Sequence, residues 1–210
     1  MFYGQTIIRS DRGFNLAPAR YGLKLVTPPA AEPITLTEAK LHCRIDADDT
    51  SQDTVINDLI AAARYRCERV ADRALISQVW RLTMDAWPND GVFLFPRAPL
   101  AWDTNANSIT YIDYQGNTQT WDSSQYNVDS DDEPGRIALA YRCIFPVILP
   151  RVNAVTVTFT AGYGAAAANV PVEIRERLKV HVGYCWENRE QRDERYLDSL
   201  FAGFWIGEYR

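Results

Sequence analysis

The sequence predicts an α+β fold that is mainly α: a helical bundle into which a small antiparallel β subdomain is inserted. A long amphipathic segment, residues 51–73, places apolar residues three and four positions apart, as a helix with one buried face does. From residue 77 to 162 short runs alternate between apolar and polar residues and are separated by turn residues, which is typical of strands. The helical pattern returns after Pro171, because proline is favoured at the first helical position.

A chain of 210 residues with 47% hydrophobic residues is expected to form one domain with a substantial core. The predicted organisation is an extended N-terminal arm, residues 1–27, followed by a single domain, residues 28–210. The arm lacks helical or strand periodicity and is basic, so we expect it to contact nucleic acid or a neighbour's acidic surface. An ordinary polar tail is the alternative. The predicted arm contacts are Arg9, Arg12, Phe14 and Arg20.

The first predicted helix covers residues 35–45. Thr35 and Glu38 have the spacing of a capping box, in which each side chain accepts a hydrogen bond from the other residue's backbone N–H. Pro33 keeps the residue before it out of the α region, so the helix cannot begin earlier. The polar turn Asp46-Ala47-Asp48-Asp49 ends it.

The second predicted helix covers residues 51–73 and would be roughly 34 Å long at 1.5 Å per residue. Thr50 or Ser51 can cap its N-terminus, and Asp53 complements the helix dipole. The expected core-facing stripe consists of Val55, Ile56, Leu59, Ile60, Ala63, Cys67 and Val70.

The β insertion is predicted over residues 77–162, with strands near 79–85, 92–95, 108–114, 118–121, 125–128, 136–140 and 152–160. In the first strand, Trp80, Leu82 and Met84 are expected to share one face. The aromatic residues of this region could form a base-stacking platform. The region carries a net charge of −4, however, which repels a nucleic-acid backbone, so core and subunit interface explain these residues better.

The third predicted helix covers residues 171–190 and is followed by a C-terminal arm, residues 191–210. The end of the chain is rich in large apolar residues, which must fold back onto the domain or bury themselves in a partner. Both interpretations remain open from the sequence. The predicted partner-docking residues are Phe201, Phe204, Trp205, Ile206 and Tyr209.

His181 and Cys185 stand four residues apart on one helix face, so a cysteine-dependent hydrolase is conceivable. That face is otherwise apolar, and the sequence indicates no third group to orient the histidine. A buried thiol is unreactive, so a pair of core residues is the preferred interpretation. The four cysteines include no Cys-x-x-Cys pair and are expected to be free thiols in a reducing compartment. No catalytic residue is therefore predicted.

Two acidic clusters could suggest a cation site. The first, Asp46, Asp48 and Asp49, has no glycine or glutamate at the positions that a calcium loop requires, and the second, Asp129, Asp131 and Glu133, is typical of a hairpin tip. A zinc site would need the fold to bring His42 and Cys43 to His181 and Cys185. Gly162-Tyr163-Gly164 does not match a phosphate loop and is interpreted as a flexible strand-to-helix junction. No metal or cofactor is predicted.

Membrane insertion is not predicted, because no run approaches the roughly 18 apolar residues of a membrane helix. The sequence starts without the charged and apolar regions of a signal peptide. A cytoplasmic protein is therefore expected.

Several motifs, in this order and spacing, resemble those of the head–tail connector (adaptor) proteins of long-tailed bacteriophages and gene transfer agents. The resemblance covers residues 25–210 and excludes the first 24. The motifs are VTPP with EPITLTEAK, the aspartate-rich turn, LIAAAR with Ala74-Leu75, QVWRL, PRAPL, PGRI, and FTAGYG before Val170-Pro171.

The resemblance implies a structural virion protein of the neck, not an enzyme, whose residues 28–210 form a head–tail adaptor domain. It implies a ring, typically of twelve copies, that lies beneath the portal protein and extends the DNA channel without sequence-specific DNA binding. The ring would dock a stopper or tail-completion protein. Within this interpretation the apolar C-terminus docks on the portal, and truncation after Arg195 is expected to leave a folded subunit. A monomeric binding module is a further alternative.

Overall fold

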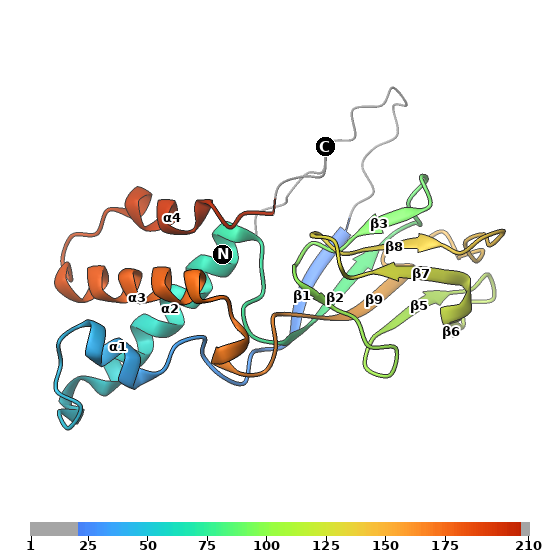
Figure 1. Ribbon diagram of the computed structural model, residues 1–210. Helices are drawn as coiled ribbons and strands as arrows, with labels where there is room; N and C mark the ends of the chain where they lie inside the picture. Colours follow the sequence, from blue (N-terminus) through green and yellow to red (C-terminus); the bar gives the residue numbers. More distant parts are fainter. Residues whose placement is uncertain (1–20, 207–210) are drawn as a thin grey trace.

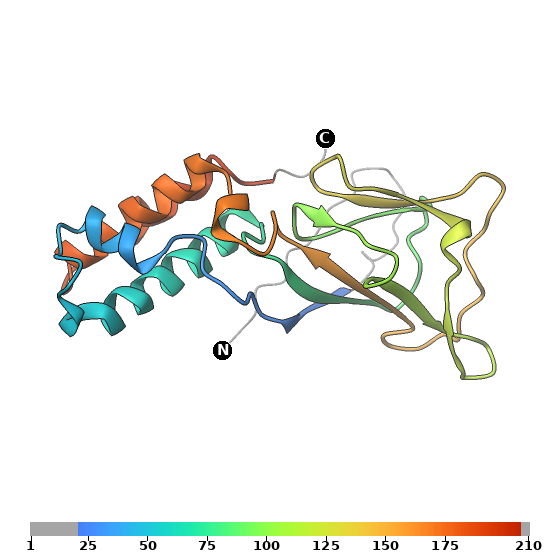
Figure 2. The ribbon, with the colours of Figure 1, turned by 60° about the horizontal axis from the view of Figure 1, so that its bottom comes forward.

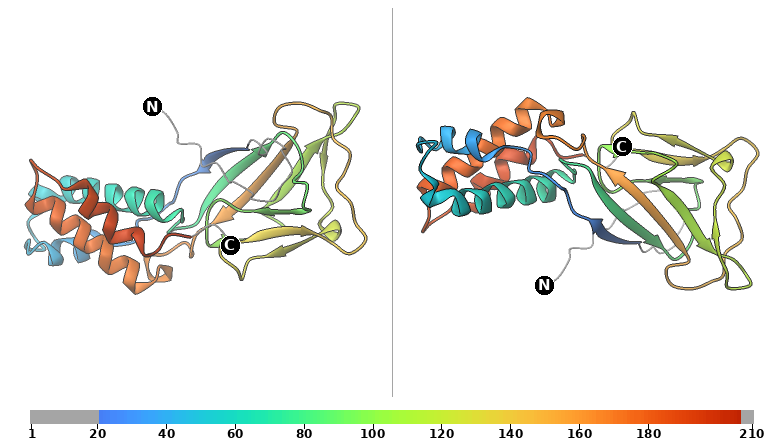
Figure 3. Two further views of the ribbon diagram at one scale, coloured as in Figure 1. Left: turned by 90° about the horizontal axis from the view of Figure 1, so that it is seen from above. Right: turned by 90° about the horizontal axis from the view of Figure 1, so that it is seen from below.

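The computed structural model describes residues 21–206, which form a helical part and a β part arranged along the long axis of the molecule (Figure 1). The helical part contains α1 (Leu36–His42), α2 (Asp53–Ala71), α3 (Val172–Glu187) and α4 (Glu194–Ala202). Strands β2 to β9 lie between α2 and α3 in the chain, whereas β1 precedes α1. Views from above and below show the two parts joined by a few adjacent connections (Figure 3).

Helix α1 begins with the predicted capping box. The backbone N–H of Glu38 donates to the Thr35 hydroxyl at 3.2 Å, and the backbone N–H of Thr35 donates to the Glu38 carboxylate at 2.8 Å. Arg175 of α3 forms an ion pair with the same carboxylate, so the cap also holds α1 against α3. Partial burial raises the pKa of the Glu38 carboxyl, but the bonds that it accepts from the Thr35 N–H and hydroxyl, together with the charge of Arg175, outweigh burial and hold this pKa below its usual value.

Helix α2 is shorter than predicted. A 3₁₀ turn, Thr50–Gln52, occupies the expected start and is capped by the Asp49 side chain, which accepts from the Ser51 N–H at 3.0 Å. The helix ends at Ala71, because Asp72 adopts a left-handed conformation with φ 54°. The predicted stripe is buried at Ile56, Leu59, Ile60, Ala63 and Cys67. Val55 is 42% exposed and does not belong to the core, which corrects its predicted position.

Helices α3 and α4 complete the helical core. Ile174, Leu178, Val182 and Cys185 of α3 are buried against α2, and Leu197, Leu200 and Phe201 of α4 close the same core. Helix α4 lies within the segment that the sequence presented as a C-terminal arm. It folds back because its apolar residues lie on one face, and the Asp193 side chain caps its start by accepting from the N–H groups of Arg195 and Tyr196.

The larger sheet is antiparallel and has the strand order β1-β2-β9-β5-β6, with β4 also paired to β9. Its strands are β1 (Tyr21–Thr27), β2 (Gln78–Met84), β4 (Leu100–Ala101), β5 (Ser108–Ile112), β6 (Thr118–Thr120) and β9 (Val155–Ala161). In β9 buried and half-buried residues alternate, as the period of two requires. Leu82 of β2 lies opposite Val157 of β9 and Leu23 of β1, so these side chains share one face.

A smaller sheet has the order β3-β8-β7, from strands β3 (Val92–Leu94), β7 (Tyr126–Asp129) and β8 (Arg136–Leu139). It lies across one face of the larger sheet (Figure 2). The two sheets share a second hydrophobic core, whose largest fully buried side chains are Phe95, Phe159, Ile109 and Ile137. Each part of the molecule therefore has its own core.

The predicted α+β class is confirmed, but the description as mainly α is not, because two sheets accompany the four helices formed by residues 21–206. Residues 21–27, placed in the extended arm by the sequence, form strand β1 and pair with β2. Trp80, Leu82 and Met84 pack on the shared face predicted for them.

Candidate functional site

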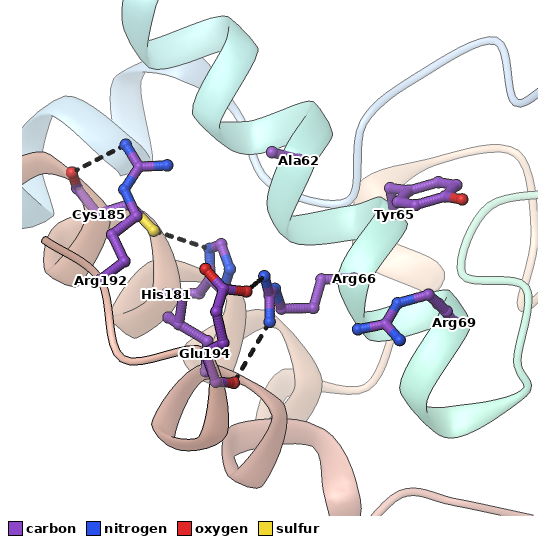
Figure 4. A pocket seen from close by; sticks show the side chains of 9 residues that line it. Ala62, Tyr65, Arg66, Arg69, His181, Cys185, Arg192 and Glu194 are labelled. Atoms are coloured by element: carbon purple, nitrogen blue, oxygen red, sulfur yellow. Dashed lines mark hydrogen bonds and ion pairs between the residues drawn. The ribbon is translucent and has the colours of Figure 1, made fainter. Parts of the chain in front are cut away.

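The Cys185–His181 pair lies on α3, at a groove of about 210 Å³ between α2, α3 and the start of α4 (Figure 4). Both side chains are 2% exposed. The Cys185 Sγ and His181 Nδ1 atoms are 3.9 Å apart, longer than the contact through which a base accepts a nucleophile's proton. The His181 ring packs against Phe201 with 5.8 Å between ring centroids. The structure therefore brings the predicted pair together inside the helical core.

The electrostatics of this pair oppose catalysis. Burial raises the pKa of the Cys185 thiol, so the sulfur stays protonated and weakly nucleophilic near neutral pH. Burial, with Arg66 and Arg192 nearby, lowers the pKa of His181 to about 4. The carboxylates lining or flanking the groove pair with arginines of α2: Arg66 bonds Glu194 and Asp198, and Arg69 bonds Asp198. The arrangement fits a packed, neutral pair in a core.

The acidic clusters have structural roles. Asp49 caps the 3₁₀ turn before α2, and the Asp46 carbonyl accepts from the Asp49 N–H at 3.1 Å. In the second cluster, Asp129 pairs with Arg136 at 2.9 Å and also accepts from two backbone N–H groups. Within residues 21–206, no group of three histidine, cysteine, aspartate or glutamate side chains is arranged to hold a metal ion.

The residues of the hypothetical zinc site do not form one cluster. A Cβ atom built on Gly183 would lie 2.9 Å from the His42 ring, so His42 packs over this glycine of α3. His181 and Cys185 belong to the buried core, where Cys43 packs only as a partly buried neighbour. None of the helices in residues 21–206 is long and apolar enough to cross a membrane.

The C-terminal residues predicted to dock on a partner divide into two groups. Phe201 is fully buried in the helical core, so it is unavailable to a partner in this fold, and its predicted role is corrected. Phe204 and Ile206 are half-buried, while Trp205 is 54% exposed. Tyr209 lies outside the described residues, as do the predicted arm contacts Arg9, Arg12, Phe14 and Arg20.

A polar junction, which the sequence did not predict, joins the two parts of the molecule at the end of α2. Arg73 donates to the Phe204 carbonyl at 2.7 Å and to the Tyr163 hydroxyl at 2.8 Å, and it forms an ion pair with Glu133. Asp72 forms an ion pair with Arg97 at 2.6 Å and accepts from the Trp205 indole at 3.3 Å. The consecutive residues Asp72 and Arg73, just after α2, therefore connect this helix to loops of the β part and to the C-terminal segment.

Glu68, whose side chain is only 13% exposed, is the carboxylate on the inner side of the same junction. Its carboxylate accepts from the Leu75 N–H at 3.0 Å, from the Gln78 side chain at 2.5 Å and from Arg64 at 3.1 Å. Burial outweighs these favourable bonds and raises the pKa of this carboxyl. Glu68 lies one helical turn before the end of α2 and satisfies polar groups at the start of β2. Arg64 lies at the helical spacing of four residues, but the separations of seven and ten residues to Leu75 and Gln78 give no periodic signal in the sequence.

The close backbone approach at Gly162 explains why glycine occurs between β9 and α3. Its φ is 133°, and a Cβ built there would lie 2.6 Å from the Ile76 backbone carbonyl. The segment Gly162–Gly164 is thus fixed against the residues that precede β2, and the Ser77 N–H donates to the Gly164 carbonyl at 2.9 Å. The glycine is therefore explained by close backbone packing and not by the flexibility that the sequence predicted for this junction.

The aromatic residues of the β part mainly form its core. Trp87 stacks on Phe145 with 4.7 Å between centroids and lies 5.0 Å from Trp121. Trp80 lies in the sheet with the Arg97 guanidinium 5.2 Å above its ring. Tyr114 is exposed at the β5–β6 turn. The rings are therefore packed against one another and do not form an open stacking platform.

The comparisons with known proteins agree with the motifs. Residues 33–92 match the family model described as phage gp6-like head-tail connector protein. This range runs from the lead-in of α1 to the first residue of β3. Among curated proteins, none matches the sequence significantly.

Three solved structures with a similar fold come from gene transfer agent (GTA) particles. They are the neck of an empty GTA particle computed with C6 symmetry (TM-score 0.74, 22% identity), the virion of a native GTA particle (0.72, 22%) and the neck of a native GTA particle computed with C12 symmetry (0.66, 23%). Each match covers 90% of this chain and 97% of the other chain. The resemblance to head–tail connector proteins is therefore confirmed: residues 33–92 match that family model, and the fold is similar to that of chains of GTA particles over 90% of this chain.

Proposed function

We propose that this protein is a structural component of a virion neck and acts as a head–tail connector. The observation that carries the proposal is the shared fold with neck chains over 90% of this chain and 97% of theirs, together with the connector match of residues 33–92. A structural role is also supported by the neutral, buried state of the Cys185–His181 pair, the candidate that the sequence offered for catalysis.

The finer proposal is a ring of identical subunits, with twelve copies, beneath the portal protein. The GTA neck structures computed with C6 and C12 symmetry support a cyclic assembly. The ring would extend the DNA channel and dock a stopper or tail-completion protein. A chain with a net charge of −5 suits a channel through which DNA passes without sequence-specific binding, because acidic surfaces do not retain phosphates.

The C-terminal segment is the proposed contact with the portal, now without Phe201. Trp205 is the large exposed ring of this segment, and Phe204 and Ile206 flank it. Arg73 holds the Phe204 carbonyl, and Asp72 holds the Trp205 indole, so both residues extend from the junction in a fixed position. Tyr209 and the basic arm, including Arg9, Arg12, Phe14 and Arg20, remain proposed partner contacts.

The decisive experiment is a reconstruction of particles that contain this chain. We expect a closed ring of this chain between the filled head and the next neck component, and particles made without the chain should be heads that lack tails. Tailed particles formed in the absence of the chain would contradict a connector function. A monomer in concentrated solution and in particles would favour a binding module.

The proposed role of the arm is tested by deleting residues 1–20, which leaves strand β1 intact. We expect the subunit to fold normally and the ring to assemble poorly. Unchanged assembly would remove the arm from the proposal without affecting the connector function itself.

A further inference from the structure

The loop between β8 and β9, residues 140–154, presents the most exposed cluster of large apolar side chains in the described part of the chain. Tyr141 is 90% exposed, Ile144 79%, Val147 71% and Val152 69%. We call these four residues the apolar strip. Large apolar side chains exposed together on one loop commonly mark a contact with another molecule.

The loop is fixed to the β part, so the strip is held in place. Phe145 points inward and stacks on Trp87, with 4.7 Å between centroids and 5° between planes. The Trp87 indole donates to the Pro146 carbonyl at 2.9 Å. The Leu149 N–H donates to the Ile112 carbonyl at 2.9 Å, and Ile148 packs on the core between the sheets. Inward anchors therefore alternate with the outward residues of the strip.

The loop that carries the strip is positively charged. Arg142 and Arg151 belong to this loop, and neither forms an ion pair with a carboxylate of residues 21–206; the Arg151 Nε donates to the neighbouring Val152 carbonyl, and the one carboxylate bonded to the loop, Asp85, accepts from the Asn153 N–H at 2.8 Å. The loop contains no acidic residue. Because it contributes +2 to a chain of −5, the remainder carries −7. The acidic remainder of a second copy is complementary in charge to these arginines.

We propose that the apolar strip is a contact between copies of this chain, seated on an acidic surface of the neighbouring subunit. Every subunit of a closed ring uses two different surfaces to meet its two neighbours. A tyrosine and arginines among aliphatic side chains have the composition of an energetically dominant interface centre. The inference rests on the proposed ring and assigns one of its two surfaces.

The test places a photo-crosslinking benzoylphenylalanine at Tyr141 in the full-length chain, both in concentrated purified protein and in particles. We expect adducts of twice the subunit mass, with the second peptide coming from another copy. An adduct to a different polypeptide, to residues 1–20 of the same chain, or none at all would overturn the proposal. If the adduct is to a different polypeptide but the same particles contain a ring of this chain, the proposed connector function is unaffected.

A matched pair of substitutions provides a second test of the proposal. Ile144→Asp and Leu41→Asp each introduce a charge at a side chain that is 79% exposed, but only Ile144 belongs to the strip. We expect Ile144→Asp to lower the fraction of chain in rings at least about tenfold, a change of 1.4 kcal/mol in assembly free energy. Leu41→Asp should leave that fraction unchanged.

Arg151→Glu should weaken assembly in the same direction, with less effect at high salt, because its partner is a carboxylate. The thermal unfolding midpoint of each dilute variant should equal that of the unaltered chain, since these side chains are exposed. Equal assembly by Ile144→Asp and Leu41→Asp would exclude the strip as an interface between copies.

Discussion

Arg73 and Glu133 form an ion pair, with 2.6 Å between Nη2 and Oε2, that connects the end of α2 to the β7–β8 loop. The same guanidinium bonds the Phe204 carbonyl and the Tyr163 hydroxyl. One side chain therefore contacts the β part, the connection from β9 to α3 and the C-terminal segment. It fixes how two parts with separate cores are joined.

The first prediction concerns this junction. Arg73→Met should lower the free energy of unfolding by about 3 kcal/mol, because it leaves three acceptors without their shared donor. Glu133→Gln should lower it by only about 0.5–1 kcal/mol, because Glu133 is 36% exposed and its pair is partly screened. Urea unfolding measures both values. Similar losses for the two variants would mean that the ion pair with Glu133 accounts for most of the contribution of Arg73 to stability.

Glu68→Ala should destabilise the protein by about 2–3 kcal/mol. The substitution removes the acceptor of the Leu75 N–H, and Leu75 is fully buried, so this donor would lose its partner without gaining water. Glu68→Gln keeps a carbonyl acceptor and should cost about half as much. Denaturant unfolding of both variants is the measurement, and a glutamine variant as unstable as the alanine variant would contradict the explanation.

His181 should make stability depend on pH. Its pKa of about 4 in the fold lies below the ordinary value of 6.5, so the unfolded chain binds more protons between these values. The associated stability is therefore complete above pH 6.5 and falls as pH decreases towards 4, by about 3 kcal/mol in total. His181→Leu should remove this part of the dependence and, because the buried Nε2 lacks a hydrogen-bond partner, cause little loss at pH 7. If the free energy of unfolding changed equally with pH in both proteins between pH 7 and 4, His181 would not be the source of the pH dependence.

Substitutions at Phe201 and Trp205 should have different effects, the first on folding and the second on docking to a partner. Phe201→Ala creates a cavity in the helical core and should cost about 3–5 kcal/mol. Trp205→Ala removes an exposed ring with one hydrogen bond and should cost at most about 1 kcal/mol, while reducing the incorporation of the chain into particles. Truncation after Arg195 should unfold the subunit, contrary to the sequence-based expectation, because it removes Leu197, Leu200 and Phe201 together. Thermal unfolding and particle composition check these outcomes.

Gly162→Ala should be far more destabilising than Gly116→Ala. Both positions have positive φ, 133° and 87°, but a Cβ at Gly162 meets the Ile76 backbone at 2.6 Å, whereas nothing lies within 4 Å of one at Gly116. We expect about 3 kcal/mol or more for Gly162 and about 1 kcal/mol of backbone strain for Gly116. Equal losses in urea unfolding would show that the close approach relaxes easily.

Local patterns in the sequence were sufficient to predict a structural feature wherever the interactions that cause it lie within a few residues. The capping box at Thr35 and Glu38, the buried face of α2 and the alternation of β9 follow from helical and strand periods, and the structure contains all three. The α+β class followed from the same periods. The balance between helix and strand did not, because β4 has only two residues and most residues of the seven-residue strand β1 are exposed, so neither strand shows a clear alternation of burial.

The sequence by itself determined the capped first helix, the buried face of the second, the alternating strands and the ordered motifs that indicate a connector. Only the tertiary structure decided which apolar residues of the chain end are core and which are surface: Phe201 is buried, and Trp205 is exposed. It also decided that Arg73, Tyr163 and Glu133, far apart in sequence, meet at one junction. The physical reason is that burial and long-range pairing depend on how separate elements pack, which no local period encodes.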